Sequence, residues 1–217
     1  MICQLVIIYS LTISDKQLQI IIGKLHLCDN LVVKAQYYLC NTRSNWLKKP
    51  FLSHSLKPWL INSDSLSKRL QKRYTHFFVK PILIKFAKPF TDESFLLRSP
   101  MSKQALIREV LLMGNDNAVV FAHSVLPRPS LRGPWNGLSK IGNQSLGETL
   151  FANPKIKRTC LTYKKLARHH PLSMRLTKHI QLQPAALWAR RSIFVLNGAK
   201  IMVTEVFLPR ILNKNNK

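Results

Sequence analysis

Hydrophobic and polar residues alternate near the end of the chain in a pattern that predicts a β-hairpin. Two apolar, β-branched runs, 192–196 and 201–208, flank the turn pair Asn197-Gly198. At a period of two, Glu205 shares its strand face with three apolar residues, Ile201, Val203 and Phe207. A carboxylate on such a face costs several kcal/mol to desolvate unless it has a partner. We therefore regard Glu205 as a candidate for chemistry.

The same alternation predicts further strands upstream, interrupted by short helices. Three segments have the pattern of strands, and a turn at Gly114–Asn117 joins the last two: 77–86, 104–113 and 118–125. The segment 127–134 is rich in Pro and Gly and predicts a loop. Helices are predicted from Ser63 or Asp64 to Leu70, from about Trp135, and over 146–151, and 156–163 is a further possible strand. Antiparallel strands with helices between them favour the α+β class.

Composition limits the range of partners. The chain has 217 residues, 46% of them hydrophobic, which is enough for one domain with its own core. It carries 34 Lys and Arg against nine Asp and Glu, a formal net charge of +25. Such an excess predicts an anionic partner, which could be nucleic acid, an anionic membrane or a small polycarboxylate.

The start of the chain differs from the rest. Residues 1–44 hold three of the four cysteines and match no recognisable motif, so we treat them as an N-terminal extension of unknown role or a mis-assigned start, ahead of a domain at 45–217. The four cysteines lack CxxC pairing, which favours free thiols in a reducing compartment. Asp15 and Lys16 interrupt the initial apolar run before it reaches bilayer length, and it lacks a cleavage site. We expect no cleaved signal and no membrane span.

Arg108 repeats the pattern of Glu205, one charge on an otherwise apolar strand face. Its face is completed by three leucine or valine residues, Leu106, Val110 and Leu112. A guanidinium remains charged when desolvated and can hold a carboxylate by two parallel N–H bonds. The plainer alternative is an arginine at a strand edge, or one paired with Glu109 or Glu205.

Other polar clusters are weaker candidates. Ser145 and Glu148 fit a capping box, and the free N–H groups of Leu146 and Gly147 would bind an anion if they faced a cavity. Of Arg190 and Arg191, at most one should point inward, with the other a solvated charge. His169-His170 fits a surface loop better than a metal site. Nucleotide-binding, zinc-hydrolase and nucleophile-elbow motifs are absent from the sequence.

Taken in order, these segments resemble the chorismate–pyruvate lyase family over about residues 46–209. Six pieces carry the resemblance: Trp59-Leu60 with Asp64–Leu70, Arg108–Leu112, Phe121–Pro127, Leu146-Gly147-Glu148, Trp188–Ser192 and Thr204–Pro209. Each piece is weak alone, but six in register are hard to obtain by chance.

The resemblance implies a fold, a reaction and a set of site residues. The fold would be a single antiparallel β-sheet with helices packed on one face and flap-like segments, such as 60–75 and 127–137, over a buried ligand site. The reaction would eliminate pyruvate from chorismate to give 4-hydroxybenzoate, the first committed step of ubiquinone biosynthesis, in a cytoplasmic monomer without metal or other cofactor. The family's ligand-binding positions fall on Leu66, Arg108, Leu146 and Glu205.

The resemblance also suggests roles for these residues, and it has two departures. Arg108, helped by the backbone N–H of Leu146, would clamp the ring carboxylate, while Glu205 would accept the hydrogen bond of the 4-hydroxyl group and assist removal of the neighbouring ring hydrogen. Leu66, where the family often has Met, would orient the ring as an apolar wall. His123 stands where the family usually has Arg, which could weaken a secondary charge contact.

Two other functions compete with a lyase. A non-catalytic, effector-type domain that binds small aromatic acids would normally follow a winged-helix module, and residues 1–44 lack that pattern. A basic nucleic-acid-binding protein would interleave aromatic and basic residues on an exposed sheet, whereas the basic residues here are scattered and no RRM, KH or zinc-finger signature occurs. We therefore expect no specific nucleic-acid partner.

Overall fold

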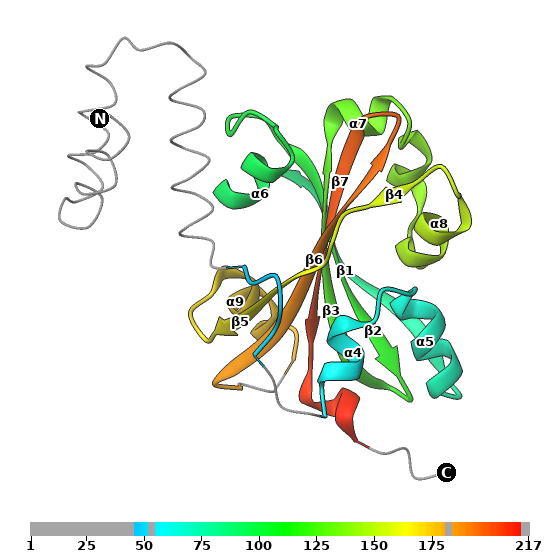
Figure 1. The fold of residues 1–217 in the computed structure, drawn as a ribbon, viewed down its shortest axis with the longest axis vertical. Helices are drawn as coiled ribbons and strands as arrows, with labels where there is room; N and C mark the ends of the chain where they lie inside the picture. The colour runs from blue at the N-terminus through cyan, green and yellow to red at the C-terminus, as the bar shows by residue number, and fades with distance from the viewer. Residues whose placement is uncertain (1–45, 52–54, 181–183, 214–217) are drawn as a thin grey trace, which may run out of the picture. The chain divides into compact units, whose positions relative to one another are not determined.

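An antiparallel sheet of seven strands organises the part of the chain that the structure describes (Figure 1). The computed structural model describes residues 46–51, 55–180 and 184–213, which belong to the unit Ser44–Lys217. The predicted extension, residues 1–44, lies outside the described residues. Within the described ranges, no helix is both long enough and apolar enough to cross a bilayer.

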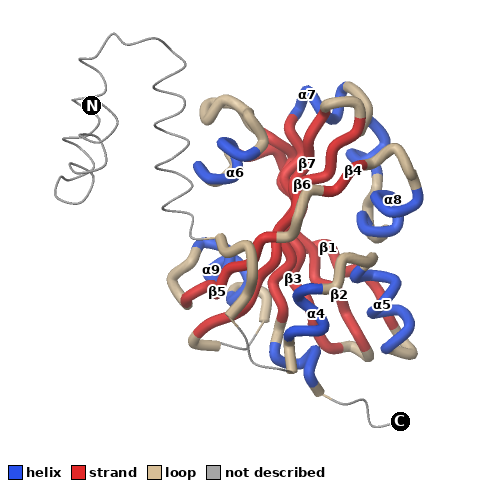
Figure 2. The backbone as a smooth tube through the Cα atoms, in the orientation of Figure 1, coloured by secondary structure: helices blue, strands red, loops and turns tan. Residues whose placement is uncertain are grey.

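The strands run in the order β1-β2-β3-β7-β6, and β4 and β5 both pair with the far side of β6. Figure 2 shows the central strands as one twisted sheet with the helices around it. The strand bounds are β1 Phe77–Ala87, β2 Ala105–Gly114, β3 Asn117–Pro127, β4 Lys157–Arg158, β5 Thr162–Ala167, β6 Ala186–Leu196 and β7 Ala199–Phe207.

Two rows of paired residues cross the centre of the sheet on the same face. One row runs Arg108, Ser124, Val203, Ser192 from β2 to β6. The adjacent row runs Val110, Ala122, Glu205, Arg190. Because side chains alternate along each strand, both rows project from one face, which we call the Arg108 face, and Glu109 and His123 project from the other, the Glu109 face.

Short helices cover both faces. On the Arg108 face, α5 (Leu66–Arg73) and α8 (Leu146–Ala152) pack beside α4 (Lys57–Ile61), α7 (Arg128–Arg132) and the 3₁₀ turn η1 (Asn136–Lys140). On the Glu109 face lie α6 (Thr91–Leu96) and α9 (Pro171–Thr177), and a second 3₁₀ turn, η2 (Pro209–Leu212), follows β7. Figure 1 shows α5 and α8 across the sheet from α6 and α9. The predicted α+β class with one antiparallel sheet is confirmed, although helices cover two faces rather than one.

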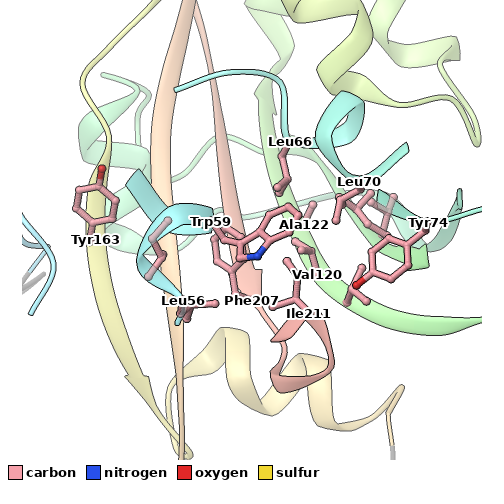
Figure 3. Close-up of a cluster of buried hydrophobic side chains, with 14 residues drawn as sticks. Leu56, Trp59, Leu66, Leu70, Tyr74, Val120, Ala122, Tyr163, Phe207 and Ile211 are labelled. Atoms are coloured by element: carbon pink, nitrogen blue, oxygen red, sulfur yellow. The ribbon is translucent and has the colours of Figure 1, made fainter. Parts of the chain in front are cut away.

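Burial of apolar side chains fixes α4 and α5 against the sheet. Figure 3 shows Trp59 and Leu70 directed toward Val120 and Phe207 in one buried cluster. Trp59 also lies under the guanidinium of Arg69, 4.4 Å from the ring centre. Leu66 and Leu70 both belong to this cluster, so the cluster holds the inward side of α5 against the Arg108 face.

The predicted strands and turns are close to those observed. The turn between β2 and β3 is confirmed, and Asn115 and Asp116 have the positive φ angles (47° and 62°) that a tight hairpin requires. The predicted strand over 156–163 is two short strands, β4 and β5, and the predicted loop over 127–134 is wrong because residues 128–132 form α7.

The cap of α5 also differs from the prediction. Ser65, not Ser63 or Asp64, is the N-cap, and its Oγ accepts a hydrogen bond from the Lys68 N–H at 3.4 Å. The helix continues to Arg73, three residues beyond the predicted end. With Ser65 as the N-cap, Leu66 is the first residue of the helix and is buried against the sheet.

Candidate functional site

A cavity lies on the Arg108 face, enclosed by α5, α8 and the central strands. All four positions predicted as binding residues line it: Leu66, Arg108, Leu146 and Glu205. Apolar side chains form most of the remaining wall, among them Val79, Val110, Leu112, Leu150, Phe151, Phe194 and Val203. The structure therefore brings the four residues to one site from four separate elements, and their assignment as ligand contacts stays a prediction.

Arg108 is a buried cation without a carboxylate partner in the described part of the chain. Its side chain is held by two backbone carbonyls, with Nη2 donating to Gly142 and Gln144 at 2.9 Å each. Its Nε is buried and has no hydrogen-bond partner among the described residues. The residue is 3% exposed, and burial lowers the pKa of the guanidinium below its ordinary value. The suggested pairing of Arg108 with Glu109 or Glu205 is wrong.

Glu205 is instead paired with Arg190, its neighbour across the β6–β7 ladder. The Nε of Arg190 lies 2.5 Å from Oε2 of Glu205. Arg190 is 1% exposed, and its Nη1 also donates to the carbonyls of Asn62 and Trp59 at 2.6 and 3.1 Å. Glu205 is thus held in place through one carboxylate oxygen while it lines the cavity, so the second oxygen can accept a hydrogen bond from a ligand.

The prediction that one of the adjacent arginines is solvated is wrong. Arg191 is only 5% exposed, and its Nη1 lies 2.7 Å from Oδ2 of Asp92 in α6. The guanidinium of Arg191 also lies over the ring of Trp46, 4.1 Å from the ring centre, which covers it further. The two side chains do point to opposite faces, as the period of a strand requires, but helices and loops cover both faces.

The predicted capping box of α8 is also wrong. Ser145 occupies the N-cap but its side chain makes no capping bond. Its Oγ instead lies 2.6 Å from the Oγ of Ser67 in α5, and Glu148 accepts from the Gln71 amide at 2.6 Å. A Cβ at Gly147 would come 3.0 Å from the Ser67 Oγ, so glycine here lets α8 approach α5 closely. Both helices are therefore tied together at the cavity. The segment 127–137 packs in the same apolar cluster as α8 and does not line the cavity.

Sequence reasoning missed one charged residue of the cavity wall, Arg158 on β4. Its Nε donates to the Ser192 Oγ at 2.9 Å and its Nη1 to the Ser63 carbonyl at 2.7 Å. The guanidinium lies 5.3 and 5.4 Å from the rings of Phe194 and Phe151. β4 has only two residues, so its alternation gives no signal, and from the sequence Arg158 is one of several scattered basic residues.

His123, the other departure from the resemblance, lies on the Glu109 face and not in the cavity. Its Nδ1 is 2.9 Å from Oε1 of Glu109, and its Nε2 is 3.1 Å from Oε1 of Glu93, an ion-pair distance with poor hydrogen-bond alignment. Arg175 also donates to Oε1 of Glu109 at 2.6 Å. Burial favours the neutral imidazole, but the two carboxylates outweigh it and raise the pKa of His123 to about 9. His123 is therefore part of a closed network of alternating charges.

A metal site is not evident where the structure describes the chain, since no three His, Cys, Asp or Glu side chains there are grouped to hold an ion. His170, read as part of a surface loop, has a local role as the N-cap of α9, where its Nδ1 accepts from the Leu172 N–H at 3.3 Å.

Comparison with known proteins gives a consistent result. The model of the family described as chorismate lyase matches residues 41–217. A probable chorismate pyruvate-lyase of Thiobacillus denitrificans is 45% identical over 168 residues, covering 77% of this chain and 90% of that protein. The protein of the same description from Nitrosomonas europaea is 50% identical over 153 residues, covering 70% and 86%.

Solved structures match less closely. A GntR-family transcriptional regulator from Bacillus cereus has a TM-score of 0.48 and 11% identity, over 62% of this chain and 92% of that one. Similarity at this level supports no inference about ligand or activity.

Proposed function

The chain belongs to the chorismate lyase family and is a lyase, and from that premise we propose that it eliminates pyruvate from chorismate to give 4-hydroxybenzoate. The observation that carries the proposal is Arg108, a desolvated guanidinium in the cavity wall with carbonyl partners but no carboxylate partner among the described residues. A cation buried in this way is costly unless an anion joins it, and chorismate and 4-hydroxybenzoate both have a ring carboxylate.

Arg108 would position the ring through that carboxylate. Its Nη2 is fixed by two carbonyls, so the planar fork keeps a defined orientation, and its unpartnered Nε can take part in binding. The backbone N–H of Leu146, at the start of α8, would add a second donor to the same carboxylate. The apolar side chain of Leu66 would press on one ring face, so that the ligand is oriented by one polar end and a narrow apolar slot.

Glu205 would act at the opposite end of the ring. Val203 lies in the same cross-strand row as Arg108, and Glu205 lies in the adjacent row, two residues further along β7. A ligand held by Arg108 at its carboxylate can thus present its 4-hydroxyl group to the free oxygen of Glu205. From there the carboxylate can also assist removal of the hydrogen on the hydroxyl-bearing carbon.

The reaction is balanced without a redox partner. The bond between the ring and the ether oxygen breaks, and its electron pair remains on the oxygen of the departing enolpyruvate. The hydrogen on the hydroxyl-bearing carbon leaves as a proton, and its electron pair completes the aromatic ring. Enolpyruvate takes up one proton at its methylene carbon to become pyruvate. Fixed hydrogen bonds and orientation would supply most of the rate.

The test is a turnover assay with purified protein, chorismate and a chelator, without added metal or nucleotide. We expect 4-hydroxybenzoate and pyruvate to appear in equal amounts. Arg108→Met should lose this activity, while Arg69→Met, which removes a cation that stacks on Trp59 outside the cavity, should retain it. Binding of 4-hydroxybenzoate without turnover would contradict the lyase and favour an effector-type domain, and neither binding nor turnover would contradict the substrate class as well.

The finer parts of the proposal come from the family resemblance. We propose that the reaction is the first committed step of ubiquinone biosynthesis and that a cytoplasmic monomer performs it without a specific nucleic-acid partner. Expression in cells that lack their own source of 4-hydroxybenzoate should restore ubiquinone, and sedimentation should give the mass of one chain. Failure to restore ubiquinone by a protein active in vitro would contradict the pathway role.

A further inference from the structure

The cavity has a second guanidinium whose charge is not cancelled by an adjacent carboxylate. Arg158 lines the cavity, and no carboxylate within the described ranges lies at ion-pair distance from it. Two of its nitrogens donate, to the Ser192 Oγ and the Ser63 carbonyl, and its remaining Nη2 makes no hydrogen bond with any described residue. The side chain is thus oriented by neutral partners and keeps a charged donor for a ligand.

The sheet places Arg158 and Arg108 on opposite walls of the cavity. Ser192, which Arg158 contacts, ends the cross-strand row that begins at Arg108 on β2. Three strand spacings, roughly 14 Å, separate the backbones of Arg108 and Ser192, and β4, which carries Arg158, pairs with β6 one spacing further along. The side chains of Arg108 and Arg158 both line the cavity. Two separate anionic groups on one ligand could therefore be held at once.

We propose that Arg158 binds the enolpyruvyl carboxylate of chorismate and so distinguishes the substrate, a dianion, from the product, a monoanion. This assignment rests on the proposed function. With the ring carboxylate at Arg108 and the 4-hydroxyl group at Glu205, the ether is on the ring carbon next to the hydroxyl-bearing carbon. The enolpyruvyl group then projects toward the wall near Glu205, and Arg158 is the cation of that wall that has no paired carboxylate among the described residues.

Electrostatics at this wall agree with such a role. Burial lowers the pKa of Arg158, and the charge of Arg190 adds to that effect, whereas the charge of Glu205 opposes it. Glu205 is itself engaged by Arg190, so it neutralises Arg158 incompletely. The same guanidinium would stabilise the negative charge that collects on departing enolpyruvate as the bond to the ring breaks. After the reaction it would hold pyruvate, whereas 4-hydroxybenzoate would have no group to offer it.

The experiment compares two probes that cannot react. One is 4-hydroxybenzoate with a carboxymethoxy group beside the hydroxyl, a dianion shaped like chorismate, and the other has an ethoxy group at that position. Calorimetry on the parent, Arg158→Met and Arg69→Met gives the ratio of the two affinities within each protein. Any general loosening of the fold affects both probes and cancels in that ratio.

We expect the parent and Arg69→Met to prefer the dianionic probe by roughly 10-fold or more, and Arg158→Met to show a preference below about 3-fold. In turnover, kcat/KM for chorismate should fall by roughly 10- to 100-fold in Arg158→Met, while the affinity for 4-hydroxybenzoate changes by less than about 3-fold. An unchanged preference in Arg158→Met would overturn the assignment.

Arg158→Lys serves if Arg158→Met does not fold, because lysine keeps the charge but not the paired N–H groups, and the preference should then drop by about 3-fold or more. An undiminished preference in Arg158→Lys would count against the assignment.

The role of Arg158 and the lyase function can be contradicted separately. If the parent converts chorismate but substitution leaves the preference intact, only the role of Arg158 is wrong. If the parent neither binds the probes nor converts chorismate, the lyase function is wrong too.

Discussion

On the Glu109 face of the sheet, Glu109 and His123 are buried beside partners of opposite sign, whereas on the Arg108 face the buried guanidinium of Arg108 meets only carbonyls among the described residues. Arg108 and Glu109 are neighbours in sequence and are almost equally buried, at 3% and 2% exposure. Glu109 and His123 are stabilised by their paired charges and need no ligand. Arg108 has no counter-ion among the described residues, so the cost of burying its charge is offset only when an anionic ligand binds. Burial of a charge alone therefore does not indicate a ligand site, whereas burial of a guanidinium without a counter-ion does.

Among substitutions that test the difference between the two faces, Glu109→Ala should have the largest effect. Glu109→Ala would leave His123 and Arg175 without a shared carboxylate on a buried face, and loss of one member of a buried pair costs about 3–5 kcal/mol of the free energy of unfolding. Chemical denaturation measures it. Glu148→Ala, the same change at an exposed position, is the control. A loss below about 1 kcal/mol in Glu109→Ala would show that the network contributes little to the fold.

The pH dependence of stability sharpens the comparison. The pKa of His123 is raised from 6.5 to about 9 in the folded protein, so its contribution is complete below pH 6.5 and is lost as the pH rises through about 9. The shift corresponds to about 3 kcal/mol. Unfolding free energies of the parent and His123→Gln, measured between pH 6 and pH 10 (roughly the span of both pKa values), should converge as the pH rises. Parallel curves would contradict an ionised, paired His123.

Glu109 should have the opposite dependence. Its burial favours the neutral acid, but hydrogen bonds from His123 and Arg175 outweigh burial and lower the pKa. Its contribution is therefore present above its ordinary pKa and is lost as the pH falls through the lowered value. Stability of the network should decline at both ends of the pH range.

Glu205→Gln tests the Arg108 face without removing its shape. The amide oxygen of glutamine can still accept from Arg190, and its N–H can donate to the oxygen of a ligand hydroxyl, but the amide is a poor base. We expect the turnover of chorismate to fall by roughly 10- to 100-fold while the affinity for 4-hydroxybenzoate stays within a few-fold. Turnover at the parent rate would show that Glu205 only hydrogen-bonds.

The smallest effect is expected where charge is exposed. Glu148 accepts from Gln71 at the outer side of the α5–α8 pair, and Glu148→Ala should change the free energy of unfolding by less than about 0.5 kcal/mol. A loss above about 1.5 kcal/mol would mean that this link, and not apolar packing, holds the cover of the cavity.

Much of the sheet could be predicted from the sequence because alternation is a strong local signal. Strands β1, β2, β3, β6 and β7 each have nine or more residues, long enough for a period of two to stand out. The helices α4, α6, α7 and α9 have five to seven residues, too few for a clear helical period, and each depends on packing against the sheet. Local rules also failed where a tertiary partner competed, as Ser67 does for the side chain of Ser145.

The residues of the site likewise divide into those that a local sequence pattern predicts and those that depend on tertiary contacts. Arg108 and Glu205 stood out because each is the one charge on a long apolar strand face, and the structure places both in the cavity wall. Arg158 gave no such signal because β4 is two residues long and its position depends on pairing with β6. The coverage of both faces, which buries Arg191 as well as Arg190, could not be read from adjacent strand positions.

The measurement that tests the account most directly is calorimetric titration of 4-hydroxybenzoate into the parent, Arg108→Met and Arg175→Met. Arg175→Met removes a cation that already has a carboxylate partner, on the opposite face. We predict that Arg108→Met loses about 2–5 kcal/mol of binding free energy, at least roughly 30-fold in affinity, and that Arg175→Met stays within about 3-fold of the parent. Equal affinity in Arg108→Met and the parent would contradict the claim that the unpaired guanidinium is kept for the ligand.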